Sequence, residues 1–381
     1  MFTDNATVDY FTIGNNGPVG EGPVFNQLLA ANGDHHALRP WLEEDGTSYV
    51  ARRTGRMIRN EQANIDNGEP IMVPEYRAVP TNNTPATMRK DDWIALDEAI
   101  LKVAKPRLRV FGDLRAAGLE YTIPDGMGKT VLQTERQTDI NAASISMSGL
   151  VQGDNDRPQF DLLNMPLPII HKDFHYDLRQ LLASRNGGSP LDTTTAELAA
   201  RRVAETVEML TIGTLASYTF GGGSIYGYTN FPSRITSVTG TAPTTAGWTA
   251  ATTVQDVLNM KQAAFNAFHF GPFRLYCSLP WDQYMDSDYN LYQGQTLRQR
   301  LAKIEGIESV DTVDYLTNGF QLILVQQSAD TVRAVCGMEI TTLQWETHGG
   351  MQVNFKVMCI LLPQLRADLN GNCGLVHAIQ A

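Results

Sequence analysis

Residues 190–214 read PLDTTTAELAARRVAETVEMLTIGT, and this stretch decides the fold because it holds the most regular helical pattern in the chain. Its apolar residues recur at steps of three and four, which predicts a buried stripe along an amphipathic helix. The stripe consists of Ala196, Ala200, Val203, Val207 and Leu210, and the charged residues off it are Arg201, Arg202, Glu205 and Glu208. Thr194 and Glu197 form a capping-box pattern at the start. About 20 residues at about 1.5 Å each predict a rod of about 30 Å, which can serve as the spine of a flat domain.

The composition is that of a folded protein. The 381 residues suffice for two or three packed modules, and 43% of them are hydrophobic. The net charge of −11 means that the molecule as a whole does not attract nucleic acid or an anionic membrane, although a local basic patch could touch nucleic acid weakly. The chain lacks the pattern of an N-terminal signal peptide and the roughly 18 consecutive apolar residues of a membrane span. We therefore expect cytosolic synthesis and no membrane partner.

Residues 1–87 predict an N-terminal arm. Clusters of Gly, Pro and Asn break regular structure throughout it, and apolar pieces such as residues 24–29 are too sparse for an independent core. Order is expected to begin where Asp91 or Asp92 can cap a helix that Pro106 stops. The apolar positions of this helix are Trp93, Leu96, Ile100 and Val103.

Two strand patterns follow this helix. Residues 118–123 and 130–135 flank the turn sequence PDGMGK and predict a hairpin. Residues 133–166 alternate weakly and carry few large apolar groups, which is typical of an extended polar ribbon. An isolated two-stranded ribbon is marginally stable in water, so we expect this one to lie on a neighbouring molecule.

The rest of the chain predicts further strands and helices. Residues 166–178 predict a core strand, and Thr253 and Asp256 are expected to cap a second helix. The stripe of that helix is Val254, Val257, Leu258, Ala264, Phe265 and Phe268. Later segments predict a half-buried strand at 271–280, a short helix at 296–304, strands at 320–327 and 331–337, and a long hairpin at 343–365 that turns at Gly349-Gly350.

Two motifs suggest a cofactor or metal site, and each has a simpler explanation. Residues 126–130, GMGKT, match the end of a phosphate-binding loop, but Ile123 stands where that motif needs a glycine, so a tight turn is expected. His171 and His175 have the spacing of metal ligands on a helix, yet the prolines before them predict extended chain, and only Asp173 is near as a further ligand. The four cysteines form no CxxC pair and are expected to be buried. No cofactor and no metal are predicted.

A basic cluster lies in the predicted arm and consists of Arg52, Arg53, Arg56 and Arg59. If this segment is helical, Arg52, Arg56 and Arg59 share a face. Two interpretations stay open. The cluster contacts DNA phosphate or an acidic neighbour, or it is a solvated face with loose ion pairs that contribute little.

No pattern predicts an enzyme. The chain has no GxSxG elbow and no cysteine placed near a histidine in a recognisable motif. Carboxylates such as Glu43, Glu44, Asp91 and Asp92 lie at helix starts or turns, where they satisfy backbone N–H groups.

From about residue 88 onward, the order of these parts resembles the encapsulin-like branch of the HK97-fold major capsid proteins of tailed bacteriophages. The similar residues are Asp92-Trp93 with Leu96-Asp97 in the first helix, Gly227-Tyr228-Thr229-Asn230 after the long helix, and Gly271-Pro272-Phe273 at the start of a strand. The resemblance covers about three quarters of the chain and rests on shared order more than on identity.

This resemblance implies an α+β fold of the HK97-like capsid type. The implied parts are an N-terminal arm at 1–87, a first part of the peripheral domain at 88–132, an extended loop at 133–166, the peripheral domain with its spine helix at 167–217, an axial domain at 218–340 and closing peripheral strands at 341–381. Some shells of this family are cross-linked through a loop lysine, but no lysine occurs between Lys129 and Lys172, so such a bond is not expected here.

The implied function is that of a major capsid protein. It would assemble as pentamers and hexamers into an icosahedral virion shell around double-stranded DNA, in the host cytoplasm, with weak non-specific DNA contact. A portal, a scaffold and a decoration protein are the implied partners, and the start at Met1 argues against a fused scaffold segment. The alternatives are an encapsulin-type nanocompartment shell and, third, an α/β enzyme.

Overall fold

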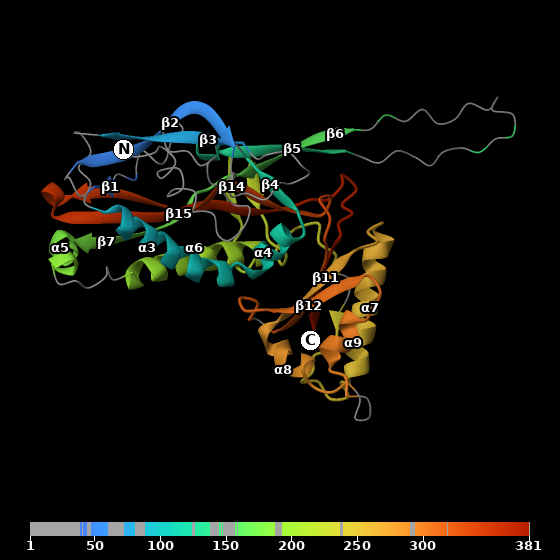
Figure 1. The fold of residues 1–381 in the computed structure, drawn as a ribbon. Coiled ribbons are helices and arrows are strands. Elements are labelled where there is room, and N and C mark those ends of the chain that lie inside the picture. The colour runs from blue at the N-terminus through green and yellow to red at the C-terminus, as the bar shows by residue number, and fades with distance from the viewer. Residues whose placement is uncertain are drawn as a thin grey trace.

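The computed structural model describes residues 39, 41–43, 47–59, 72–80, 88–123, 126–137, 145, 147, 157, 159–186, 193–236, 239–289, 294–317 and 319–380. These residues form two modules and a ribbon that projects from them (Figure 1).

The first, the spine module, is built on a four-stranded sheet in the order β4-β14-β15-β7. Its strands are β4 (Glu120–Thr122), β7 (Ile170–Asp177), β14 (Val332–Thr347) and β15 (Gln352–Leu365). The predicted long hairpin is confirmed, because β14 and β15 pair antiparallel and the chain turns at His348–Gly350. Helices α3 (Lys90–Ala104), α4 (Arg109–Ala116) and α6 (Thr194–Ile212) lie along one side of this sheet (Figure 1).

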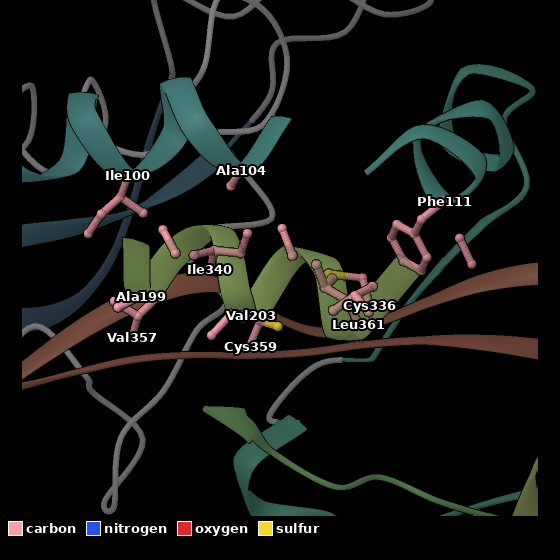
Figure 2. Packing of buried hydrophobic residues seen from close by; sticks show 14 of the residues in the cluster. Ile100, Ala104, Phe111, Ala199, Val203, Cys336, Ile340, Val357, Cys359 and Leu361 are labelled. Atoms are coloured by element: carbon pink, nitrogen blue, oxygen red, sulfur yellow. The ribbon is translucent and has the colours of Figure 1, made fainter. Parts of the chain in front are cut away.

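Helix α6 is the predicted spine, and all five residues of its predicted stripe are buried. The predicted cap at Thr194 is wrong by one residue, because Thr193 is the N-cap and its hydroxyl donates to Glu197 at 3.1 Å. The prediction that Glu205 and Glu208 lie off the buried face is also wrong, since they are 7% and 1% exposed. The reason is that α6 lies between the sheet and the helices α3 and α4, so more than one of its faces is covered (Figure 2).

Helix α3 ends as predicted, but Arg89, and not Asp91 or Asp92, is its N-cap. Asp92 accepts the backbone N–H of Arg89 at 3.1 Å, and this closes the N-terminus of the helix. The helix ends at Ala104, and Pro106 lies in the short 3-10 turn that follows. Trp93 is fully buried and meets the ring of Phe355 edge-on at 5.9 Å.

The described part of the arm is more ordered than predicted. It forms a three-stranded sheet of β1 (Trp41–Leu42), β2 (Ser48–Arg59) and β3 (Met72–Pro80). Trp41 is 2% exposed and belongs to the main core. Arg39 binds the carboxylate of Asp97 at 2.6 Å, and its guanidinium lies 4.4 Å from the ring of Trp93. This part of the arm therefore packs on α3 of its own chain.

The predicted hairpin between residues 118–123 and 130–135 is wrong. β4 pairs in parallel with β14, and β5 (Val131–Gln137) pairs antiparallel with β6 (Phe160–Pro166). Both segments are strands as predicted, but their partners are distant in sequence. Residues 124 and 125 of the turn sequence lie outside the described residues.

The second, the five-stranded module, has the strand order β10-β16-β13-β11-β12. Its strands are β10 (Thr239–Gly240), β11 (Phe273–Ser278), β12 (Ile307–Val313), β13 (Phe320–Gln326) and β16 (Leu375–Gln380). Helices α7 (Ala250–Asn266) and α9 (Leu297–Ala302) pack on one face of this sheet around Val257, Leu275 and Leu301. The strand predicted to be half-buried, β11, is buried on both faces because the spine module covers its other side.

The second helix differs from its prediction at both ends. Thr249, not Thr253 or Asp256, is the N-cap, and it accepts the backbone N–H of Thr252 at 3.4 Å. Phe268 is 76% exposed because α7 ends at Asn266 and Phe268 turns away with φ of 62°.

Two predicted domain boundaries need correction. β14 begins at Val332, so the spine module resumes before residue 341. The last strand, β16, pairs with β13 of the five-stranded module, so the segment 341–381 does not close a single sheet. The chain crosses between the modules more often than the contiguous ranges 218–340 and 341–381 allow.

We expect Phe355→Ala to destabilise the protein by about 3–5 kcal/mol, because the fully buried ring contacts Phe174, Tyr176 and Trp93. Urea unfolding measures this loss. The matched control is Leu198→Ala on α6, where the side chain is 50% exposed and a change within about 0.5 kcal/mol is expected. Equal losses in the two variants would contradict this account of the core.

Candidate functional site

The ribbon of β5 and β6 is the feature that stands out from the body (Figure 1). Its strands pair from Val131 opposite Pro166 to Gln137 opposite Phe160. Arg136 and Asp161 form a cross-strand ion pair at 2.7 Å. The predicted polar ribbon within 133–166 is therefore present in its described residues, although residues 138–144 and 148–156 lie outside them.

The ribbon carries large apolar side chains that the rest of the described chain leaves uncovered. Phe160 is 63% exposed and Leu162 is 59% exposed, and the more distal Ile145 and Met147 are fully exposed. Exposed apolar groups on a two-stranded ribbon cost free energy in water, and a contiguous group of them marks a contact surface. These side chains are a better signal of contact than the polar alternation on which the prediction rested.

A cavity of about 360 Å³ lies at the root of the ribbon. Its wall includes Leu162, Leu163, Tyr226, Phe231 and Pro363, together with the polar Thr134 and Arg136. The short hairpin of β8 (Tyr218–Phe220) and β9 (Gly223–Ile225) borders it, and Tyr218 and Phe220 add 47% and 53% exposed rings there. The contact surface thus extends from the ribbon onto the body of the spine module.

The predicted turn residues Gly227 and Asn230 close the end of the spine helix. Asn230 accepts the N–H of Gly227 at 2.7 Å and donates to the carbonyl of Leu215 at 3.2 Å. Within the same turn, Tyr228 and Thr229 donate their backbone N–H groups to Thr211 and Ile212, at 3.0 and 2.8 Å. These bonds satisfy carbonyls in the last turn of α6 that have no partner within a helix.

The other predicted pair, Gly271 and Pro272, lies at the start of β11. Gly271 has φ of 100°, which favours glycine, and its carbonyl accepts from the side chain of Gln326 at 3.1 Å. The carbonyl of Pro272 accepts the N–H of Gln327 at 2.8 Å. Both residues therefore set the entry of β11 beside β13.

A cluster of polar side chains joins the two modules, and we call it the joint cluster: Asp113, Glu208, Tyr228, Arg274 and Tyr276. Asp113 of α4 binds Arg274 at 2.7 Å and accepts from the hydroxyl of Tyr276 at 3.1 Å, and both partners lie on β11. Glu208 of α6 accepts the backbone N–H groups that begin α4. The sequence analysis missed this cluster, although Glu208 lies four residues after Ala204 and eight after Ala200, a spacing that places it on the apolar face.

The histidine motif of His171 and His175 and the glycine motif at residues 126–130 lie on separate elements. His171 and His175 lie on strand β7 and are exposed, and His171 lies 3.7 Å from Asp173. Residues Gly126–Gly128 form a 3-10 turn, in which a Cβ on Gly126 would lie 2.2 Å from the carbonyl oxygen of Gly337. The turn therefore packs against β14.

The acidic cluster Glu120, Cys336 and Glu339 has ligand atoms within 4.8 Å of one another. The guanidinium of Arg115 makes ion pairs with both glutamates and lies where a cation would be needed. Burial raises the pKa of the Cys336 thiol well above its ordinary value, and Glu339 raises it further. This cluster is therefore an ion-pair network in which Arg115 holds both carboxylates.

Arg52, Arg53, Arg56 and Arg59 lie on strand β2. The conditional prediction of a shared helical face is wrong, because β2 pairs with β3 along this stretch. Arg56 is exposed. Among the described residues, no helix is long and apolar enough to cross a membrane.

Comparisons with known proteins find a family model and solved structures that are similar to this chain. A family model described as "Family of unknown function (DUF6260)" matches residues 82–378. No curated protein matches the chain. Similar solved structures are the virus-like particle from Pyrococcus furiosus, the capsid of the Myoviridae phage XM1 and the capsid of an empty GTA particle.

In that order, the sequence identities are 15%, 9% and 12%, and the TM-scores are 0.48, 0.50 and 0.48. The matches cover 74%, 70% and 72% of this chain, and 97%, 91% and 91% of the other chains. The likeness to the XM1 capsid shows the fold. The chain has the HK97-like capsid fold that its order of elements predicted.

We expect Gly227→Ala to destabilise the protein by about 1–3 kcal/mol, because a Cβ there would lie 2.3 Å from the backbone nitrogen of Gly213 and 2.4 Å from the carbonyl oxygen of Leu210. Urea unfolding measures the change. Gly112→Ala in α4 is the matched control, since its Cβ would meet nothing within 4 Å and alanine favours a helix by about 1 kcal/mol. A stable Gly227→Ala protein would refute the close approach of the turn to α6.

Proposed function

We propose that this chain, which belongs to the DUF6260 family of proteins of unknown function, is a capsid subunit that assembles with identical copies into a closed shell. The observation that carries the proposal is the ribbon of β5 and β6, whose apolar side chains Phe160 and Leu162 lie outside the body of their own chain. The HK97-like fold supports it, since this fold is that of the XM1 capsid.

The ribbon would be completed by contact with a neighbouring copy. Burial stabilises by about 25 cal/mol per Å² of apolar surface, so rings such as Phe160 and Phe220 contribute strongly once a second molecule covers them. The cavity at the ribbon root offers a concave surface beside these exposed rings. A convex ribbon and a concave root on one chain suit repeated contacts between identical copies.

In the complete form of this proposal, pentamers and hexamers build an icosahedral virion shell around double-stranded DNA in the host cytoplasm. A portal, a scaffold and a decoration protein would be its further partners. The net charge of −11 fits a shell that holds DNA weakly, because affinity for DNA rises steeply with the number of phosphate contacts. The arginines of β2, Arg52 to Arg59, are the proposed DNA-facing or interface cluster.

The proposal is of a structural protein and not of an enzyme. All four cysteines are buried, and burial raises the pKa of Cys277 and of Cys373 to about 12. Thiols of this kind hold too little thiolate at neutral pH to act as nucleophiles. The polar joint cluster lies between two modules, which suits a structural role.

Purified full-length protein is expected to form closed particles of megadalton mass, because the ribbon leaves apolar surface that only other copies cover. Electron microscopy with light scattering measures this directly. A protein that stays monomeric at high concentration would contradict the proposal. Packaged nucleic acid in particles from infected or producing cells would favour a virion over a cargo-filled compartment, and enclosed protein without a genome would favour the compartment.

We expect Leu162→Glu to abolish assembly while leaving the protomer folded, because Leu162 is 59% exposed on the ribbon and a buried charge disrupts a contact. Light scattering measures assembly, and circular dichroism measures folding. Leu198→Glu on α6 is the matched control, since Leu198 is 50% exposed but lies away from the ribbon. Normal particles from Leu162→Glu would exclude the ribbon as a contact.

A further inference from the structure

Glu208 is a buried carboxylate that forms no ion pair with any of the described residues. Its side chain is 1% exposed, and it accepts the backbone N–H groups of Val110 and Phe111 at 2.7 and 3.3 Å. These two N–H groups belong to the first turn of α4, where an intrahelical acceptor does not exist. The carboxylate of one helix therefore caps the N-terminus of another.

The charged groups around Glu208 do not neutralise it. On α4, Arg109 donates to the carbonyl of Thr312 at 2.9 Å, and on β11, Arg274 binds Asp113. On α6 itself, Glu205 is paired with Arg201 and Arg202. Asp113 on α4 and Asp314 after β12 also act on Glu208, and both are negative, although Arg274 pairs with Asp113 and Arg109 lies 3.9 Å from Asp314.

Tyr228 belongs to the same joint cluster. Its hydroxyl is buried and makes no hydrogen bond among the described residues, while its ring stacks on Tyr276 with centroids 6.1 Å apart. Burial raises the pKa of Tyr228, and the charge of Glu208 raises it further, so the hydroxyl lies within electrostatic reach of the carboxylate. A phenol O–H can donate to an ionised carboxylate, so the lack of this bond means that the hydroxyl is not within hydrogen-bond distance of Glu208 in this structure.

We propose that Glu208 is a proton-operated switch in the joint between the two modules. When ionised, it caps α4 through Val110 and Phe111. When it takes a proton from solvent, it loses its charge, becomes a weaker acceptor and releases at least one of these N–H groups. Because α4 also holds β11 through Asp113, the proton state of Glu208 sets how firmly the five-stranded module is attached to the spine module.

The environment places this switch near neutral pH. Burial raises the pKa of Glu208 to about 7, the two backbone N–H groups oppose the rise, and Asp113 and Asp314 add to it. Between the ordinary pKa of 4.5 and about 7, the folded protein binds more protons at this site than the unfolded chain. The contribution of Glu208 to stability therefore falls as the pH rises through this window. The inference does not depend on whether the chain assembles.

Hydrogen exchange on the full-length protein at pH 8 and pH 6 tests the switch. After correction for the intrinsic chemical rate, protection of the amides of Val110 and Phe111 is expected to fall by about ten-fold at pH 6, since one pH unit below the pKa leaves about one tenth of the carboxylate ionised. In Glu208→Gln this pH dependence should disappear.

Glu205→Gln is the matched control, a glutamate buried on the same helix but paired with arginines, and it should keep the wild-type transition. If Glu208→Gln fails to fold, infrared spectroscopy of the wild-type protein replaces it, and a band of a protonated buried carboxyl should appear with a midpoint near pH 7. Protection at residues 110 and 111 that is independent of pH, or a transition that persists in Glu208→Gln, would overturn the proposal.

Discussion

The whole structure depends on the enclosure of helix α6 between a sheet and two other helices. Figure 2 shows Ala199 and Val203 of α6 between Ile100 and Ala104 of α3 and the strand residues Val357 and Cys359. Small side chains on α6 allow both layers to approach closely, and the buried alanines are Ala196, Ala199, Ala200 and Ala204. An enclosed helix cannot shift without opening two interfaces, so α6 fixes the frame to which the ribbon and the five-stranded module attach.

Enclosure also removes the last carbonyls of α6 and the first N–H groups of α4 from water. These backbone groups therefore need hydrogen-bond partners within the protein. The turn at Gly227 satisfies the carbonyls of Thr211 and Ile212, and Glu208 satisfies Val110 and Phe111. Each of these two contacts brings a segment that is distant in sequence to the end of α6. The two modules therefore meet at a polar cluster, and a buried cluster of this kind is specific in geometry but sensitive to charge.

The sequence predicted the elements better than their partners. Helices α3 and α6 and the hairpin of β14 and β15 follow from local periodicity, caps and turn residues, which act within about ten positions. The hairpin at 118–135 was wrong because the edge of β14 competes for β4 from more than 200 residues away. The prediction that Glu208 lies off the buried face was wrong for a related reason. A narrow apolar stripe describes a helix with one covered face, whereas α6 has more than one covered face. The exposed apolar side chains of the ribbon follow from no local pattern, because only the complete fold defines which side chains stay uncovered.

The ribbon combines two properties that oppose each other. Exposed Phe160 and Leu162 favour association, whereas a free strand edge with apolar side chains favours aggregation with any other edge. The ion pair of Arg136 and Asp161 lies among these side chains and must keep its hydrogen bonds in any contact. A partner surface that buried these apolar side chains and left the ion pair without hydrogen bonds would lose part of the free energy that the apolar contact contributes. In the proposed assembly, the ribbon therefore needs a partner surface with a matching polar position.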